Sequence, residues 1–420
     1  RQNNMMNFKI FALAIIGITF LFQTYVEWLQ IKSAEREIPE NVRDVYDKDA
    51  YQKWLCYYKE KTRLSLFRHI VFYVITFVIV GFDVYAGIVD GLSLKGDYAA
   101  ALGVLEAHML VSLVYDIPFS YVNFMKVEQK YGFNRMTKKT FIVDQIKQAV
   151  IGLVLTGGIC ALFILVHKAL GNWLLPVFTG IMLVFLLVMA MLTPVIGKIY
   201  NKFQPLPEGG LKDRLTKLLE DNGCTVKAIR VMDGSRRSTK ANAFFAGMGR
   251  TKTIVLYDTL LEQMTEDEIM AVFAHEMGHN KHRDILKNYA MNIFHIALAV
   301  LLAWGLVSKP EIYGDFGFQG LNYGFGFYLL SGVCLSFLSP FLGLFTNLFF
   351  RQFEYAADRF AAENGYGEAL VSALKVLARN SFYCLSPHPV LETLTSSHPT
   401  ISQRVAEIEN LTVGSHGKET

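Results

Sequence analysis

The sequence LLPVFTGIMLVFLLVMAMLTPVIGKI, from Leu174 to Ile199, contains a single charged residue, Lys198. An apolar helix of roughly 20 residues is long enough to cross the hydrocarbon core of a bilayer. Seven runs near this length are improbable in a soluble core, where apolar helices are usually shorter. We therefore predict an α-helical polytopic membrane protein with seven transmembrane helices. The other six runs are Phe8 to Trp28, Leu66 to Val89, Ala99 to Phe124, Ala149 to His167, about Tyr289 to Val307 and Gly324 to Phe350.

The composition agrees with a membrane protein. Apolar residues make up 52% of the 420 residues and charged residues only 19%. The run Phe8 to Trp28 lacks a small-residue cleavage site and is followed by further spans, so we expect a retained anchor and not a signal peptide. The five cysteines are scattered and form no CxxC pair, which argues against a disulfide framework and against a cysteine zinc site.

The distribution of Lys and Arg predicts the orientation in the membrane. The segments Ile31 to Ser65 and Lys126 to Lys147 are rich in both, whereas the alternate loops hold only Lys95, Lys168 and Lys309. Basic loops stay on the cytoplasmic side, so we expect the N-terminus outside and the C-terminus inside. The net charge of +4 follows from this bias and gives no reason to expect a nucleic-acid partner.

The polar part of the chain is split by the last two spans. We predict transmembrane helices 1 to 5 with cytoplasmic loops in 1–200, the first part of a small α+β domain in 201–287, helices 6 and 7 in 288–350, and the second part of the domain with the tail in 351–420. A small sheet is expected from the β-like runs Thr225 to Met232, Asn242 to Ala246 (NAFFA) and Thr253 to Tyr257, with a hairpin at Gly247 to Gly249.

A long helix is predicted to begin near Glu266. Thr265 with Glu268 three residues later forms a capping-box pattern, and acidic residues fill the first turn. We expect this helix to run on toward the sixth span.

The motif HEMGH, His275 to His279, lies on that helix. Residues four apart point to one side of a helix, so His275 and His279 can bind one metal ion, and Glu276 can activate the water at the open coordination position. A catalytic zinc needs three protein ligands. The best third ligand is Glu354 in EYAAD, and Asp358, one turn further on, can orient a ligand histidine.

These motifs together resemble the type I CAAX prenyl endopeptidases, a family of integral membrane zinc proteases. HEMGH and EYAAD are accompanied in order by EQKYGFNRMTKKTF (128–141), KFQPLPEGGLK (202–212), NAFFA, IVLYDTLL (254–261) and SHPTISQR (397–404). The resemblance implies seven helices around a large chamber and a gluzincin-like domain with one Zn²⁺ per chain at its cytoplasmic end. It also implies that Asn242 lies near the bound substrate, and that His398 and Arg404 lie beside the reaction centre.

The expected substrate is a membrane-associated or prenylated (CAAX-type) peptide or protein, and the expected surroundings are membrane lipid. His108, Glu106 and Asp116 are candidates for a polar chamber lining. His282, His295 and His388 are not expected to bind the metal. The tail 414–420 shows no retrieval signal for the endoplasmic reticulum, and the outer loops are short, so we favour a bacterial plasma membrane over the endoplasmic reticulum or the nuclear envelope. Because residue 1 is Arg, the start of the natural chain is expected to be missing.

Three other classes remain open at this point. An intramembrane metalloprotease would carry HExxH inside a span, but charged residues flank this motif on both sides. A quality-control metalloprotease of the heat-shock type would share the zinc domain and need fewer spans. A transporter or receptor with a structural zinc site would have no use for Glu276, which a hydrolase needs.

Overall fold

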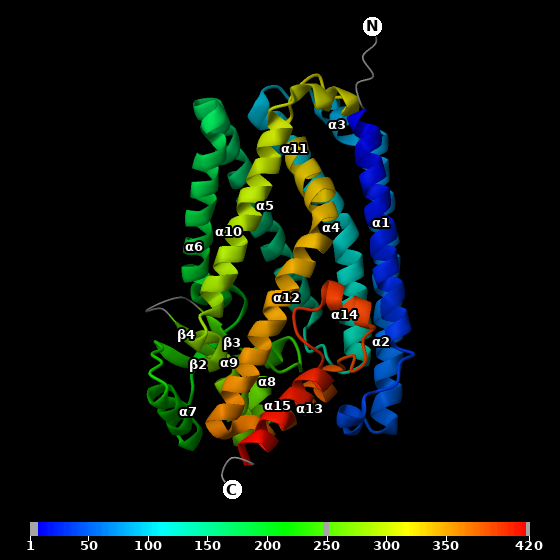
Figure 1. Ribbon diagram of the computed structural model, residues 1–420. Coiled ribbons are helices and arrows are strands. Elements are labelled where there is room, and N and C mark those ends of the chain that lie inside the picture. The colour runs from blue at the N-terminus through cyan, green and yellow to red at the C-terminus, as the bar shows by residue number, and fades with distance from the viewer. Residues whose placement is uncertain (1–6, 247–251, 417–420) are drawn as a thin grey trace.

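Long helices running side by side build most of the protein (Figure 1). The computed structural model describes residues 7–246 and 252–416. Six continuous segments in this part of the chain are long and apolar enough to cross a membrane. One of them, Lys138–Thr193, contains both α5 and most of α6, which a short 3₁₀ turn separates. The long helices are α1 (Phe8–Ser33), α2 (Lys48–Gly81), α4 (Asp97–Val122), α5 (Lys138–Leu170), α6 (Leu174–Tyr200), α10 (Asp284–Val307) and α12 (Ser336–Ala361).

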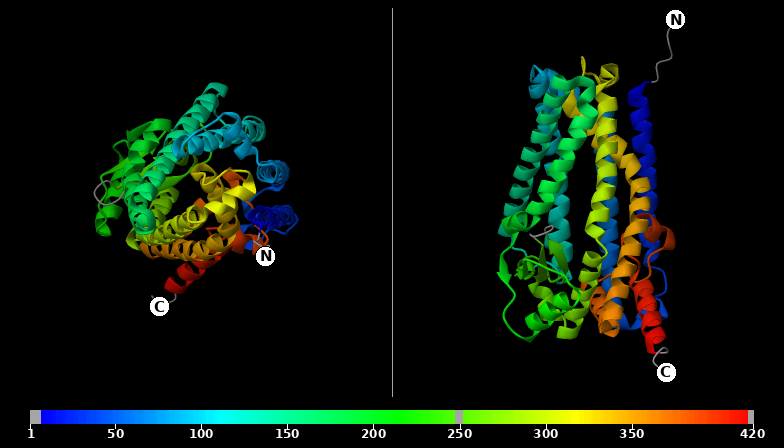
Figure 2. Two further views of the ribbon diagram at one scale, coloured as in Figure 1. Left: turned by 90° about the horizontal axis from the view of Figure 1, so that it is seen from above. Right: turned by 60° about the vertical axis from the view of Figure 1, so that its left-hand side comes forward.

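These helices close into a ring. Following the chain, α1 contacts α2, and α2 contacts α4. Helix α4 contacts α5, α5 contacts α6, and α6 contacts α10. The π-helical turn η7 (Leu330–Leu335) joins α11 (Tyr323–Leu329) to α12 and contacts α10, and α12 contacts α1. Seen from above in Figure 2, the helices surround the centre of the molecule. The membrane helices therefore form a ring, as expected.

Two polar cavities lie among the membrane helices, with volumes of about 460 and 390 Å³. Arg68, His108 and Asp116 line both of them, and Glu106 lines the second. Arg68 donates to Asp116 Oδ1 at 2.6 Å. The three residues expected in a polar chamber lining thus face cavities, because polar groups inside a membrane ring are tolerated where they pair or meet water.

Helix α2 differs from the predicted span. It begins at Lys48, well before Leu66, and Asp47 caps it by accepting from the Ala50 backbone N–H. The helix ends at Gly81 because Asp83 adopts a left-handed conformation with φ of 54°, and the short helix α3 (Val84–Gly91) follows. Residues 48–65 of the basic segment therefore belong to the same helix as the second predicted span.

A small four-stranded sheet lies at one end of the ring (Figure 1). Its strand order is β1-β2-β4-β3, with β2 (Ala228–Met232) parallel to β4 (Thr253–Tyr257) and β3 (Ala243–Ala246) antiparallel to β4. The three expected strands are present, and sequence analysis missed β1 (Phe203–Pro205), a short edge strand that ends in proline. The hairpin expected at Gly247 to Gly249 lies outside the described residues.

One face of the sheet forms the main core of this domain. Ile254 and Leu256 on β4 are fully buried against α9 (Glu266–Lys281) and α7 (Gly210–Asp221), where Phe273 and Leu215 are also fully buried. The remaining helices and turns are η1 (Glu40–Val45), η2 (Asn123–Glu128), η3 (Gly171–Trp173), η4 (Gly234–Arg236), α8 (Asp258–Gln263), η6 (Pro310–Phe316), η8 (Ala362–Tyr366), α13 (Gly367–Ser381), α14 (Pro389–Thr395) and α15 (Ile401–His416).

Helix α9 starts as predicted and ends earlier than expected. Thr265 and Glu268 form the reciprocal capping box at its N-terminus. The expectation that it runs on toward the sixth span was wrong, because Arg283 has a left-handed φ of 57° and a new helix, α10, begins at Asp284. This break turns the chain away from α9 directly after the motif HEMGH.

Candidate metal centre

Helix α9 places two histidines on one side and an apolar surface on the other. Phe273, Ala274 and Met277 are fully buried in the domain core, which fixes the rotation of the helix about its axis. His275 and His279, four residues apart, point together away from that core, and their Nε2 atoms lie 3.2 Å apart. His275 is buried with 7% exposed, and His279 is partly buried.

Helix α12 brings Glu354 to the histidines because it packs directly on α9. At Gly278 the two backbones approach so closely that an added Cβ would lie 2.7 Å from the Ala357 Cα. Glycine is therefore required at this position in HEMGH, and it sets the separation of the two helices. Glu354, one turn before Ala357, is buried with 7% exposed and faces both imidazoles.

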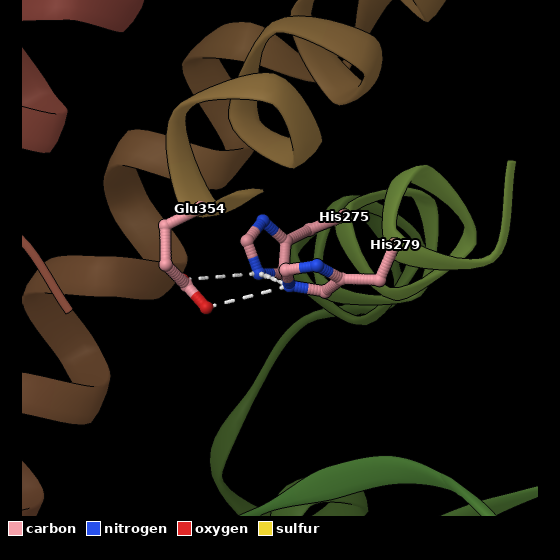
Figure 3. Close-up of side chains that lie close together, drawn as sticks. All are labelled: His275, His279 and Glu354. Carbon is pink, nitrogen blue, oxygen red and sulfur yellow. Dashed lines mark hydrogen bonds and ion pairs between the residues drawn. The ribbon is translucent and has the colours of Figure 1, made fainter. Parts of the chain in front are cut away.

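The three side chains form a triangle that fits a metal ion (Figure 3). Glu354 Oε2 lies 3.5 Å from His275 Nε2, and Glu354 Oε1 lies 3.4 Å from His279 Nε2. With metal–ligand distances of about 2.0–2.2 Å and tetrahedral angles, ligand atoms are roughly 3.3 Å apart. The two oxygens of Glu354 thus each face one imidazole nitrogen. A buried carboxylate facing two imidazole nitrogens is a donor set suited to a divalent cation.

Two carboxylates hold the histidines from behind. Asp358, fully buried, lies 2.9 Å from His275 Nδ1, and Asp284 Oδ2 lies 3.0 Å from His279 Nδ1. A carboxylate accepts from N–H, so each ring carries its proton on Nδ1 and presents the Nε2 lone pair to the triangle. Asp358 was expected in this position. Asp284 was missed, because five residues beyond His279 it would lie on a different face if α9 continued.

Arg404 connects the carboxylates on α12. Its Nε donates to Asp358 Oδ2 at 2.8 Å and its Nη2 to Asp358 Oδ1 at 2.6 Å. Its Nη1 lies 3.1 Å from Glu354 Oε2. The guanidinium is buried, with 7% exposed, and these anions raise its pKa against the opposing effect of burial. Arg404 therefore pairs its single positive charge with two buried carboxylates and lies beside the triangle.

His398 also lies close to the triangle. Its Nε2 lies 3.2 Å from Glu354 Oε1, while its side chain is 64% exposed. The imidazole is thus close enough to touch a molecule bound at the triangle and exposed enough to move with it.

Glu276 lies next to the ligand pair on the same helix and is partly buried. Burial raises its pKa, and the neighbouring Glu354 adds to this, although His275, His279 and Arg404 oppose it. A raised pKa makes a carboxylate a better proton acceptor near neutral pH. The second residue of the motif therefore lies beside the ligands with its pKa shifted in the direction that a general base requires.

Asn242 lies at the start of the edge strand β3. Its backbone carbonyl accepts from the Tyr257 N–H at 3.0 Å, and its exposed side chain accepts from the N–H of Ala243. Strand β3 pairs with β4 alone among the described residues, and α9 contacts it. The free edge beside the helix of the metal triangle is therefore able to receive an extended peptide. The other histidines considered, His282, His295 and His388, lie outside the triangle.

Comparison with known proteins places these features in one family. Residues 205–412 match peptidase family M48, and residues 27–202 match the CAAX prenyl protease N-terminal domain of five membrane helices. The chain is 28% identical to "CAAX prenyl protease 1 homolog" of Oryza sativa over 95% of this chain and 96% of that protein. It is 28% identical to "CAAX prenyl protease 1" of Saccharomyces cerevisiae over 93% of this chain and 92% of that protein.

A solved structure agrees with the sequence relatives. The crystal structure of S. mikatae Ste24p superposes with a TM-score of 0.89 at 27% identity, covering 96% of this chain and 99% of that chain. The shared fold includes both the membrane helices and the small α+β domain. A transporter or receptor with a structural zinc site is therefore excluded. The chain belongs to peptidase family M48 and is a polytopic membrane metalloendopeptidase.

Proposed function

We propose that this protein is a zinc endopeptidase that cleaves membrane-tethered peptide tails of the CAAX type from the cytoplasmic side. The observation that carries the proposal is the triangle of His275, His279 and Glu354, with ligand atoms 3.2 to 3.5 Å apart. His₂Glu is a donor set of catalytic zinc, which leaves one position for water or substrate. When bound, the ion supplies Lewis-acid activation of water and of the substrate carbonyl.

Each remaining residue has a distinct role in this proposal. Glu276 takes the proton from the attacking water and passes it to the leaving amine. His398, exposed at the rim, donates a hydrogen bond to the oxyanion of the tetrahedral intermediate. Arg404 keeps Glu354 ionised, and Asp358 orients His275. The free edge of β3 at Asn242 holds the substrate backbone in an extended conformation.

The substrate class follows from the membrane ring and from the relatives. The related proteins of rice and yeast are named CAAX prenyl proteases. A lipid-bearing tail binds more readily when its anchor dissolves near the spanning helices, because this raises the local concentration of the tail at the sheet. We infer a prenylated or otherwise lipid-tethered peptide as the substrate, with membrane lipid as the surrounding partner.

Topology and domain boundaries belong to the same proposal. The basic segments put the protease domain on the cytoplasmic side. The chain then divides into membrane helices 1–200, the first domain part 201–287, membrane helices 288–350 and the second domain part 351–420. The relatives reported above are eukaryotic, so the bacterial plasma membrane expected from the tail and the short outer loops stays a prediction.

The test is cleavage of a prenylated CAAX peptide by purified protein in detergent. We expect one cleavage event per peptide, loss of activity after treatment with a chelator and recovery on addition of Zn²⁺. The matched substrate is the same peptide with an unmodified cysteine, which should be cut with a higher KM. Cleavage that is insensitive to the chelator would refute the zinc mechanism, and equal cleavage of both peptides would refute the preference for lipid-tethered substrates.

A further inference from the structure

A polar cavity of about 620 Å³ separates the membrane helices from the loop that precedes β3. The charged residues in its lining are Lys61, Glu128, Asp144, Arg237 and Lys240. Arg237 pairs with both Asp144 oxygens, at 2.9 and 3.1 Å, and forms a neutral pair. The other three groups are one carboxylate and two ammonium groups, so the lining carries one uncompensated positive charge.

Glu128 is the centre of this charged group. It is 5% exposed, and its Oε1 accepts from Lys61 Nζ at 2.8 Å and from Tyr57 Oη at 2.7 Å. Lys240 Nζ is more distant, at 3.3 Å from Oε2. Lys61 and Tyr57 bond one oxygen of Glu128 and Lys240 faces the other, so two ammonium groups share a single carboxylate and one positive charge is left over.

Lys240 is held in place and remains partly accessible. Its Nζ donates to Tyr57 Oη at 3.2 Å and lies 4.7 Å from the centre of the Phe133 ring. Its backbone carbonyl accepts from Thr259 Oγ1 at 3.0 Å, and 34% of its side chain is exposed. Burial lowers the pKa of Lys240, which Glu128 partly offsets. A second anion close to this partly buried ammonium group would favour its charged form.

The position of Lys240 next to β3, the strand proposed to hold the substrate, indicates which anion it binds. Lys240 precedes Asn242 by two residues, and β3 starts at Ala243. Antiparallel pairs of strands are the commoner kind, and a peptide added antiparallel to β3 runs with its C-terminal end toward Asn242 and Lys240. The four residues of β3 span about 13 Å, which is enough for the last residues of a CAAX tail.

We propose that Lys240 binds the free α-carboxylate at the C-terminus of the substrate, so that the enzyme measures the distance from the chain end to the metal triangle. The inference rests on the proposed function, because it assumes a peptide along β3. A tail of the CAAX type ends in a carboxylate a few residues beyond its cysteine, whereas an internal segment of a protein does not. Lys240 thereby favours chain ends over internal sites.

Matched peptides test this inference. We use one prenylated peptide as the free acid, the same peptide as the C-terminal carboxamide, and a form extended by one glycine, which moves the carboxylate by roughly 3.3 Å. Wild type should cleave the free acid with a KM at least about tenfold below that of the amide, since a charge-assisted hydrogen bond is lost. The glycine-extended peptide still ends in a carboxylate, but at a shifted position. If Lys240 requires the carboxylate in register, the KM of this peptide should resemble that of the amide; general attraction of an anion would instead give the KM of the free acid.

Variants assign the effect to Lys240. Lys240→Met should cleave acid and amide with equal KM at unchanged kcat, and Lys240→Arg should keep the preference. The double variant Glu128→Gln, Lys240→Met removes a charge of each sign and serves if the single variant is unstable. Lys130→Met is the control, because Lys130 pairs with Glu60 on the surface at 2.8 Å and lies outside the cavity lining.

The outcomes are distinct. A wild type that cleaves acid and amide equally, or a folded Lys240→Met that still prefers the acid, would overturn the role of Lys240 and leave the proposed function standing. Failure of wild type to cleave either peptide, with zinc bound, would refute the proposed function and this inference together.

Discussion

Asp284 accepts a hydrogen bond from Nδ1 of His279 at 3.0 Å, although the helix that carries His279 has already ended. The left-handed conformation of Arg283 turns the chain so that the first residue of α10 returns to the last turn of α9. Lys287 Nζ in turn donates to Asp284 Oδ1 at 2.8 Å. The start of a membrane helix therefore orients a ligand of the metal triangle, which couples the ring of helices to the site.

This geometry predicts an order of metal affinities. Glu354→Ala removes a ligand and should weaken zinc binding far more than Asp358→Asn or Asp284→Asn, which disturb only the orientation of a histidine, an effect on the order of 10- to 100-fold. Competition with a chromophoric chelator measures the affinities. Asp267→Asn, at the exposed start of α9, is the control. Equal affinity in wild type and Glu354→Ala would contradict the ligand assignment.

Replacing Glu276 by Gln should separate metal binding from catalysis. The amide leaves His275, His279 and Glu354 in place and cannot take the proton from water, so zinc content should be retained while kcat falls by roughly 10²- to 10⁴-fold. Metal analysis of the same sample that is used for kinetics gives both readouts. Near-normal turnover by the zinc-loaded variant would remove Glu276 from the mechanism.

The contact between Gly278 and Ala357 predicts a structural cost for a single methyl group. Gly278→Ala places a Cβ within 2.7 Å of a backbone atom of α12, so the two helices must separate. We expect a loss of about 1–3 kcal/mol of stability and weaker zinc binding, because Glu354 moves with α12. Gly305→Ala in α10, where a Cβ meets nothing within 4 Å, should cause neither. Unchanged metal affinity in Gly278→Ala would show that the added methyl group is accommodated without moving Glu354.

Some of this site could be predicted from sequence and some could not. The i, i+4 spacing of His275 and His279 and the capping box at Thr265 are local, so their consequences follow from helix geometry alone. The role of Asp284 depends on one left-handed residue, Arg283, whose conformation no periodic pattern indicates. The cluster of Lys61, Glu128 and Lys240 joins segments far apart in the chain, and strand β1 exists only through its pairing with β2. Such contacts are set by tertiary packing.

Arg404 and Asp358 should be strongly coupled. Arg404→Met alone leaves Asp358 and Glu354 buried without their cation, and breaking a buried pair in this way costs about 3–5 kcal/mol. Adding Asp358→Asn removes one of the two charges, so the double variant should be less destabilised than the sum of the single variants. Thermal unfolding in detergent of the four proteins gives the comparison. Additive effects would show that the pair does not act as a unit.

The last prediction concerns the side of the membrane on which the site lies. The basic segments predict that the sheet and α9 lie on the cytoplasmic side. Figure 1 shows α3, which the loop of Lys95 follows in the chain, at the opposite end of the ring from the sheet. A cysteine introduced at Arg236, an exposed residue beside the buried Gly234, should react only with a reagent supplied to the cytoplasmic face. A cysteine at the exposed Lys95 should react only from the other face.

Both cysteines are introduced into a variant without the five native cysteines, because Cys56 is exposed in α2 and would itself be labelled. Labelling in sealed vesicles of known orientation reads out the two positions. Reaction of the Arg236 position from the outer face would reverse the orientation, and substrate tails would then have to reach the metal triangle from outside the cell or organelle.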